Sequence, residues 1–277
     1  MVKVPQKIIH NRYLRHKKKF PHVWCPGCSN GIVLGAIVRA VDELKLTRSN
    51  TAMVSGIGCS SRMPVYVDFN TLHSLHGRAI AYATGIKMVK PEMDVMVVTG
   101  DGDATAIGGN HFIHAARRNI DITVILINNN IYGMTGGQYS PTTHKGDIAT
   151  TTPYGNIDPE FDICNLAIGA GATFVARTTA FHTIEAQSFI KKGLEHKGFA
   201  LIEIVAACPV IYGRLNKKGE PADMMIQMRE NAIPIKAYEK LPDDKKEGKY
   251  QRGIFKQEIK PEYTEEYKNL ILSLKEN

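Results

Sequence analysis

Hydrophobic residues along this chain form two alternating kinds of run. Short runs rich in β-branched residues are typical of strands buried in a parallel sheet. Five such runs are present, at 51–58, 95–99, 122–127, 173–176 and 199–206. Between them, apolar residues recur every three or four positions, which predicts helices. These predicted helices cover 31–44, 77–89, 107–119, 158–168 and 183–196. The alternation predicts one doubly wound α/β domain with a mostly parallel sheet.

The pattern weakens after about residue 213. Residues 214–262 are charged and punctuated by proline and glycine, which predicts an extension packing on the domain or on a partner. A final amphipathic helix is predicted over 263–274. We therefore divide the chain into an α/β domain at 1–213 and a C-terminal extension at 214–277.

Composition narrows the class of protein. The 277 residues are 43% hydrophobic, enough for a full core. Because the chain shows no secretory leader and no long apolar run, we expect a cytoplasmic protein that does not cross a membrane.

The net charge of +8 comes partly from a basic run near the N-terminus, formed by Arg12, Arg15 and Lys17–Lys19. A solvated face and a docking site for an acidic partner both fit this run. Nucleic acid is not an expected partner, because the basic residues do not alternate with aromatic ones.

Polar residues follow two of the predicted strands at the point where each ends. Residues 100–103 read Gly-Asp-Gly-Asp, and residues 128–130 are three asparagines. The carboxyl ends of parallel strands form the edge where α/β sheets bind ligands. Carboxylate and carboxamide oxygens suit Mg²⁺, which keeps part of its coordination shell for phosphates. Asp-Gly alone is ordinary turn chemistry, but the strand–helix–strand context favours a magnesium–diphosphate site.

The two segments together resemble the thiamine diphosphate motif, in which Gly-Asp-Gly is followed, after a helix and a strand, by paired asparagines. The resemblance implies that Asp101 and Asn129 bind Mg²⁺ through their side chains and Ile131 through its carbonyl. It also implies that Gly100 and Gly102 let the backbone approach the diphosphate.

Four of the five cysteines stand at positions that could bring them together at one edge of the sheet. Cys25 and Cys28 form Cys-Pro-Gly-Cys, and Cys59 and Cys208 each follow a predicted strand. Four thiolates could therefore converge beside the diphosphate site, where they would suit Zn²⁺ or an iron–sulfur cluster. The spacing does not distinguish these metals. Cys164 lies in a predicted helix, and we interpret it as a small buried hydrophobe.

The order of the motifs along the chain resembles the β subunit of a 2-oxoacid:ferredoxin oxidoreductase over about residues 20–215. The resemblance is carried by Trp-Cys-Pro-Gly-Cys at 24–28, Gly-Ile-Gly-Cys-Ser at 56–60, His-Gly-Arg at 76–78, Gly-Asp-Gly-Asp at 100–103, and the segment 129–138. It implies a thiamine diphosphate-binding fold and one [4Fe–4S] cluster held by Cys25, Cys28, Cys59 and Cys208. The family's usual glycine after the second cysteine is Ser29 here.

The resemblance also assigns residues to the cofactor. It implies that these residues contact thiamine diphosphate or its Mg²⁺: Ile57, Gly58, Cys59, Ser60, His76, Gly102, Asp103, Gly133, Met134 and Thr135. We expect His76 to open a helix, where an imidazole is biased toward its neutral form and can accept or shuttle a proton.

Arg62 is the candidate for binding substrate. Its guanidinium could grip a carboxylate with two hydrogen bonds, and residues 60–66 resemble the 2-oxoglutarate branch of the family. The alternative is an ion pair with an internal acid such as Asp68.

The resemblance implies coenzyme A-dependent oxidative decarboxylation of 2-oxoglutarate to succinyl-CoA, or the reverse carboxylation. Electrons would pass through the cluster to ferredoxin. Since 277 residues leave little room for the domain that grips the cofactor's pyrimidine, the resemblance implies an α subunit, in a heterodimer or an α2β2 assembly. Three alternatives stay open: pyruvate or a branched 2-oxoacid as substrate, a non-redox thiamine enzyme half with structural zinc, and a non-catalytic electron-transfer or scaffold subunit.

Overall fold

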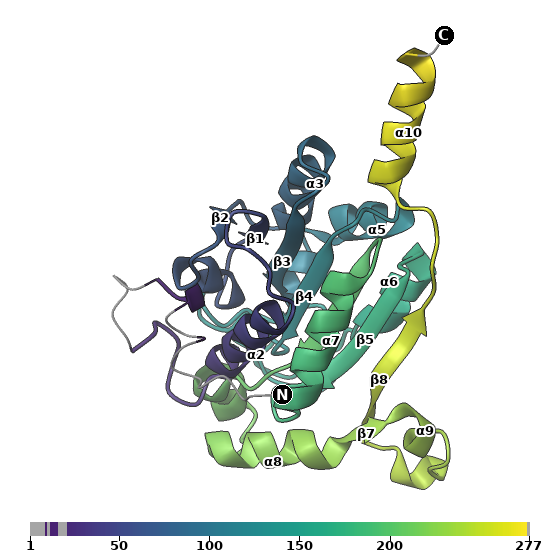
Figure 1. The fold of residues 1–277 in the computed structure, drawn as a ribbon. Coiled ribbons are helices and arrows are strands. Elements are labelled where there is room, and N and C mark those ends of the chain that lie inside the picture. The colour runs from purple at the N-terminus through teal and green to yellow at the C-terminus, as the bar shows by residue number, and fades with distance from the viewer. Residues whose placement is uncertain (1–8, 10–11, 16–20, 276–277) are drawn as a thin grey trace.

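The computed structural model describes residues 9, 12–15 and 21–275. Its centre is an eight-stranded sheet in the order β2-β1-β3-β4-β6-β5-β8-β7 (Figure 1). The strands are β1 (Thr51–Ser55), β2 (Asn70–His73), β3 (Asp94–Gly100), β4 (Thr123–Asn128), β5 (Phe174–Thr179), β6 (Ala200–Val205), β7 (Ala232–Pro234) and β8 (Tyr250–Gln257). In this order, the first six strands (β2, β1, β3, β4, β6 and β5) are parallel to one another. This confirms the predicted fold class.

The described helices are α2 (Asn30–Glu43), α3 (Ala79–Val89), α4 (Asp101–Thr105), α5 (Gly109–Arg117), α6 (Ile163–Ala170), α7 (Thr183–Glu195), α8 (Pro221–Asn231), α9 (Ile235–Tyr238) and α10 (Tyr263–Lys275). Five of them cover the two faces of the sheet. Helices α2 and α7 pack in one core with Met96 of β3, whereas α3, α5 and α6 pack in the other with Val97. Neighbouring residues of a strand thus serve opposite faces, as the two-residue period of a strand requires.

The C-terminal extension contributes to the same sheet. Strand β8 pairs antiparallel with β5, and α10 then leads away from the body of the molecule (Figure 1). The hydrophobic pattern does not predict β2, β7 or β8, because these strands are short or only half-buried. The division of the chain at residue 213 stays a prediction.

Several predicted elements differ at their ends. The strand predicted over 51–58 ends at Ser55, and the strand predicted over 173–176 continues to Thr179. The helix predicted from residue 158 begins only at Ile163, because Asp162 accepts a hydrogen bond from the Asn165 N–H and caps the first turn. The helix predicted from residue 77 begins at Ala79.

The basic N-terminal run is only partly described. The guanidinium of Arg12 lies 2.6 Å from an oxygen of Asp42, and that of Arg15 donates to the Val67 carbonyl. Lys17–Lys19 lie outside the described residues. Within residues 9, 12–15 and 21–275, no helix is long and apolar enough to cross a membrane.

Candidate active site

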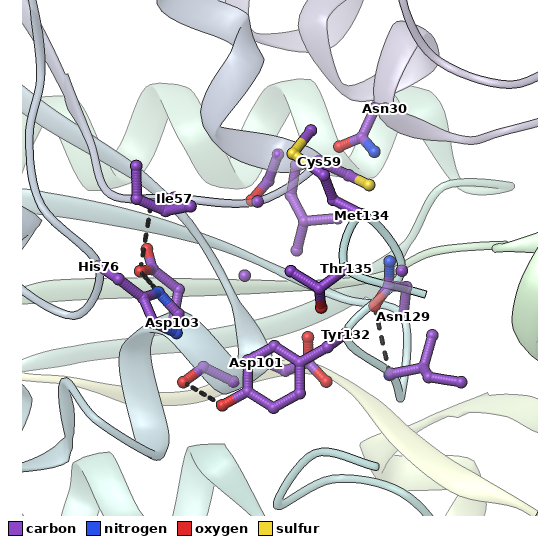
Figure 2. Close-up of a pocket in the computed structure, with 17 residues that line it drawn as sticks. Asn30, Ile57, Cys59, His76, Asp101, Asp103, Asn129, Tyr132, Met134 and Thr135 are labelled. Atoms are coloured by element: carbon purple, nitrogen blue, oxygen red, sulfur yellow. Dashed lines mark hydrogen bonds and ion pairs between the residues drawn. The ribbon is translucent and has the colours of Figure 1, made fainter. Parts of the chain in front are cut away.

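The carboxyl ends of β1, β3 and β4 border one pocket (Figure 2). Its lining includes all residues expected to contact thiamine diphosphate or Mg²⁺, namely Ile57, Gly58, Cys59, Ser60, His76, Gly100, Asp101, Gly102, Asp103, Asn129, Ile131, Gly133, Met134 and Thr135.

Asp101 is a buried carboxylate with one oxygen already engaged. Its Oδ2 accepts hydrogen bonds from Ser140 Oγ at 2.5 Å and Thr142 Oγ1 at 2.7 Å. Burial raises the pKa of this carboxyl group, and the two hydroxyls act in the opposite direction. No described side chain hydrogen-bonds to Oδ1, so this oxygen is available to a metal ion in the pocket.

The three asparagines at the end of β4 have different partners: the middle one faces the pocket, and the other two bind inside the protein. Asn129 lines the pocket, and its Oδ1 accepts from the Ile131 N–H. Asn128 donates to Glu203 Oε1 at 2.8 Å, and Asn130 donates to the Thr142 carbonyl. The outer two asparagines therefore hold the turn, and the middle one offers oxygen to the pocket.

The carboxylate of Asp103 forms all its hydrogen bonds with other groups of the protein. Its Oδ1 lies 2.6 Å from His76 Nδ1 and accepts from the backbone N–H groups of Gly77 and Ile57 (Figure 2). Its Oδ2 accepts from the hydroxyl of Thr99. Asp103 can therefore offer a ligand only its backbone, and its side chain ties together the loops that follow β1, β2 and β3.

His76 does not open a helix, so that expectation was wrong. It lies three residues before the start of α3, and its immediate partner is the Asp103 carboxylate rather than a helix N-terminus. Because Asp103 takes Nδ1, the other ring nitrogen, Nε2, is left for a ligand. The imidazole side chain is 36% exposed and packs edge-on against Tyr132.

Gly102 is required by the ring of Tyr132. A Cβ atom at residue 102 would lie 2.2 Å from Tyr132 Cζ, and the Tyr132 hydroxyl donates to the Gly102 carbonyl at 3.1 Å. Burial raises the pKa of Tyr132 to about 12. Tyr132 was not among the residues expected at the site, although its place two residues after the three asparagines was a usable signal.

Cys25, Cys28, Cys59 and Cys208 gather at the edge of the pocket. A Cβ atom at Gly133 would lie 3.5 Å from Cys208 Sγ and 3.6 Å from Cys59 Sγ. Burial and then the proximity of the other three thiols raise the pKa of Cys59 to about 12. Trp24 donates to the Cys59 carbonyl at 2.6 Å, which joins the Cys-Pro-Gly-Cys segment to the loop after β1.

The donor set of four thiols suits Zn²⁺ or an iron–sulfur cluster. Among the described residues, no three His, Cys, Asp or Glu side chains surround a single ion position. Cys164 lies elsewhere, buried in the core as predicted, with its thiol 3.3 Å from Glu203 Oε2.

Arg62 lies on a 3₁₀ turn (Ser60–Val65) beside the site, but outside the lining of the pocket. Its guanidinium makes no hydrogen bond or ion pair with another described residue. The alternative partner, Asp68, is instead 2.5 Å from Arg48, so the internal pair was a wrong interpretation. Substrate binding by Arg62 stays a prediction.

Asn30 is a second lining residue that the sequence analysis missed. It is buried, its amide nitrogen lies 3.2 Å from Cys28 Sγ, and its oxygen has no partner. The usable signal was its position two residues after the Cys-x-x-Cys pair.

Comparison with known protein families first identifies the class of enzyme. Residues 56–204 match the family model of the thiamine pyrophosphate enzyme, C-terminal TPP binding domain. The matched segment contains the pocket from Ile57 to Thr135.

Named relatives define the family within this class. The chain is 52% identical to 2-oxoglutarate synthase subunit KorB of Methanocaldococcus jannaschii, over 95% of this chain and 97% of the relative. It is 48% identical to the subunit of the same name from Methanothermobacter thermautotrophicus, over 94% of this chain and 91% of the relative. The chain belongs to the β-subunit family of the 2-oxoacid:ferredoxin oxidoreductases.

A solved structure supports the same family. It is described as 2-oxoglutarate:ferredoxin oxidoreductase from Magnetococcus marinus with 2-oxoglutarate, coenzyme A and succinyl-CoA bound. One of its chains matches with a TM-score of 0.84 and 33% identity, over 99% of this chain and 92% of that chain.

Proposed function

We propose that this chain is the β subunit of a 2-oxoglutarate:ferredoxin oxidoreductase and that its pocket holds thiamine diphosphate. The observation that carries the proposal is the meeting of two donor sets at one pocket. Oxygen donors from Asp101, Asn129 and Ile131 line one end, and Cys25, Cys28, Cys59 and Cys208 gather at the other.

In this proposal, Mg²⁺ binds Oδ1 of Asp101, the Asn129 side chain and the Ile131 carbonyl. The diphosphate lies against Gly100, Gly102, the Asp103 backbone and residues 133–135, because these line the same wall of the pocket. When bound, thiamine diphosphate acts as the electron sink for decarboxylation of a 2-oxoacid. His76 presents Nε2 to the pocket and holds or moves a proton there.

The four cysteines would hold a [4Fe–4S] cluster in this proposal, and the cluster would supply the one-electron acceptor between the pocket and ferredoxin. Coenzyme A takes the acyl group. The substrate is assigned as 2-oxoglutarate, because several relatives are named for it and the solved relative is described with it bound. The structural-zinc and electron-transfer alternatives are disfavoured by the family and by the complete set of cofactor residues.

An α subunit completes the site. Apolar side chains at the pocket and its rim are unusually exposed: Ile57 is 40%, Met134 49% and Leu75 65% exposed. Ile107, 53% exposed, adjoins Gly77 beside His76. A partner surface that covers these side chains would exclude water from the pocket.

The experiment is anaerobic co-purification of the chain with its α subunit. Iron analysis, thiamine diphosphate binding and viologen reduction are then measured with 2-oxoglutarate, pyruvate and a branched 2-oxoacid. We expect a brown protein with about four irons per chain, and fastest reduction with 2-oxoglutarate plus coenzyme A. A colourless zinc protein, or full activity of the isolated chain, would contradict the proposal.

A further inference from the structure

Asn30 occupies the boundary between the two cofactor sites. It is the first residue of α2, two positions after Cys28, and is only 2% exposed. Figure 2 shows its side chain close to Cys59 and Met134, at the opposite end of the pocket from Asp101. The residues assigned to the magnesium site do not contact this buried polar group through any hydrogen bond of the described residues.

The nitrogen end of the Asn30 amide faces sulfur. Nδ2 lies 3.2 Å from Cys28 Sγ, within the range of an N–H···S hydrogen bond. A thiolate only accepts hydrogen bonds, so this end of the amide is the one that fits.

The oxygen end of the same amide has no partner. Oδ1 is buried and accepts no hydrogen bond from any described residue. Buried polar atoms in native proteins are nearly always paired, and leaving one unpaired carries a free-energy penalty. Because Asn30 lines the pocket, an occupant of the pocket can supply the missing donor.

We propose that Asn30 joins the two sites, donating from its amide N–H to the Cys28 thiolate and accepting at Oδ1 from an N–H or O–H group of the bound cofactor. This inference rests on the proposed function. The positive end of the N–H dipole stabilises an added electron on the cluster, so this hydrogen bond raises its reduction potential. Asn30 thus acts on the cluster through Cys28 as a positioning and tuning residue.

The test uses Asn30→Ala and Asn30→Asp in the assembled enzyme. The cluster potential is measured by a redox titration followed by electron paramagnetic resonance, and thiamine diphosphate affinity by titration of cofactor-depleted protein. For Asn30→Ala we expect the equilibrium constant for one-electron reduction to fall about tenfold, a potential about 59 mV more negative. We also expect several-fold weaker cofactor binding.

Asn30→Asp separates the two ends of the amide. The carboxylate keeps an acceptor oxygen but loses the N–H donor and adds negative charge. We therefore expect a potential at least as negative as in Asn30→Ala, with cofactor affinity closer to that of the unmodified enzyme.

Ser29→Ala is the matched control. Ser29 is equally buried and adjacent, but its hydroxyl bonds to the Ala207 N–H and the sulfur of Met225, not to a cysteine. Its removal should leave the potential unchanged. An unchanged potential in Asn30→Ala with full iron content, or an equal shift in Ser29→Ala, overturns the cluster half of the inference. Unchanged cofactor affinity in Asn30→Ala overturns the other half. Absence of a cluster from the unmodified enzyme would instead contradict the proposed function.

Discussion

His76 Nδ1 lies 2.6 Å from Asp103 Oδ1, although 27 positions separate the two residues. The same carboxylate accepts from the backbone of Gly77 and Ile57. One buried side chain therefore sets the orientation of the imidazole and the positions of two loops of the pocket.

Replacement of Asp103 should disturb both the orientation of the His76 imidazole and the positions of the two pocket loops. In Asp103→Asn, the amide cannot accept from all four donors that meet the carboxylate, and each buried N–H left unpaired costs about 1–3 kcal/mol. We expect thiamine diphosphate affinity to fall at least tenfold, and kcat to fall about 100-fold because of misplaced groups. Cofactor titration and steady-state kinetics measure this. Asp243→Asn, at a surface position with a 97% exposed side chain, should leave both unchanged.

Gly102→Ala should exclude the cofactor by distorting the wall of the pocket. The new Cβ would meet the rigid ring of Tyr132 at 2.2 Å, so the ring or the backbone must shift. We expect thiamine diphosphate binding to weaken by more than tenfold. Gly109→Ala is the control, because a Cβ there meets nothing within 4 Å and alanine favours a helix. Equal binding by both variants would show that this close approach is unimportant.

Ser140 and Thr142 should set the affinity of the site for Mg²⁺. Both donate to Oδ2 of Asp101, and loss of such supporting hydrogen bonds typically costs 10–100-fold in metal affinity. Ser140→Ala and Thr142→Val should raise the Mg²⁺ concentration needed for cofactor binding by about tenfold each. Thr142→Ser keeps the hydroxyl and should stay near the original value. The idea fails if the valine and serine variants at residue 142 behave alike.

The cysteines should divide into four that hold iron and one that does not. Cys59→Ser should remove most of the iron and the visible absorption of the anaerobically purified enzyme, because a thiolate ligand is lost. Cys164→Ser should retain full iron, since that thiol lies in the core against Glu203. Iron analysis of both variants measures the difference, and iron loss in Cys164→Ser alone would refute the assignment.

Arg62 should distinguish substrates by their second carboxylate. Its guanidinium has no partner in the part of the chain that the structure describes, whereas Arg48 and Asp68 form their own pair. Arg62→Ala should raise KM for 2-oxoglutarate at least tenfold, with little change for pyruvate, because a charge-assisted contact is lost. Equal losses on both substrates would remove Arg62 from substrate recognition, and Arg48→Ala serves as the control.

Local sequence patterns determined most of the framework. The β-branched runs that became β1, β3, β4, β5 and β6, and the helices between them, follow from residue periodicity, which each segment carries by itself. The polar residues at the ends of β3 and β4 were equally readable, because parallel strands bring their carboxyl ends to one edge. The four cysteines were found by the same reasoning and by their motifs.

Only the tertiary structure decided how the polar groups pair. Asp103 lines the pocket as expected, but its side chain binds His76, and Ser140 returns from 39 positions away to bind Asp101. The spacing of Asn30 from the Cys-x-x-Cys pair did not reveal that its amide oxygen would be buried without a partner, and the edge strands β2, β7 and β8 were too short or too polar to predict. These features depend on contacts between distant segments, and such contacts are set by the path of the folded chain rather than by local residue preference.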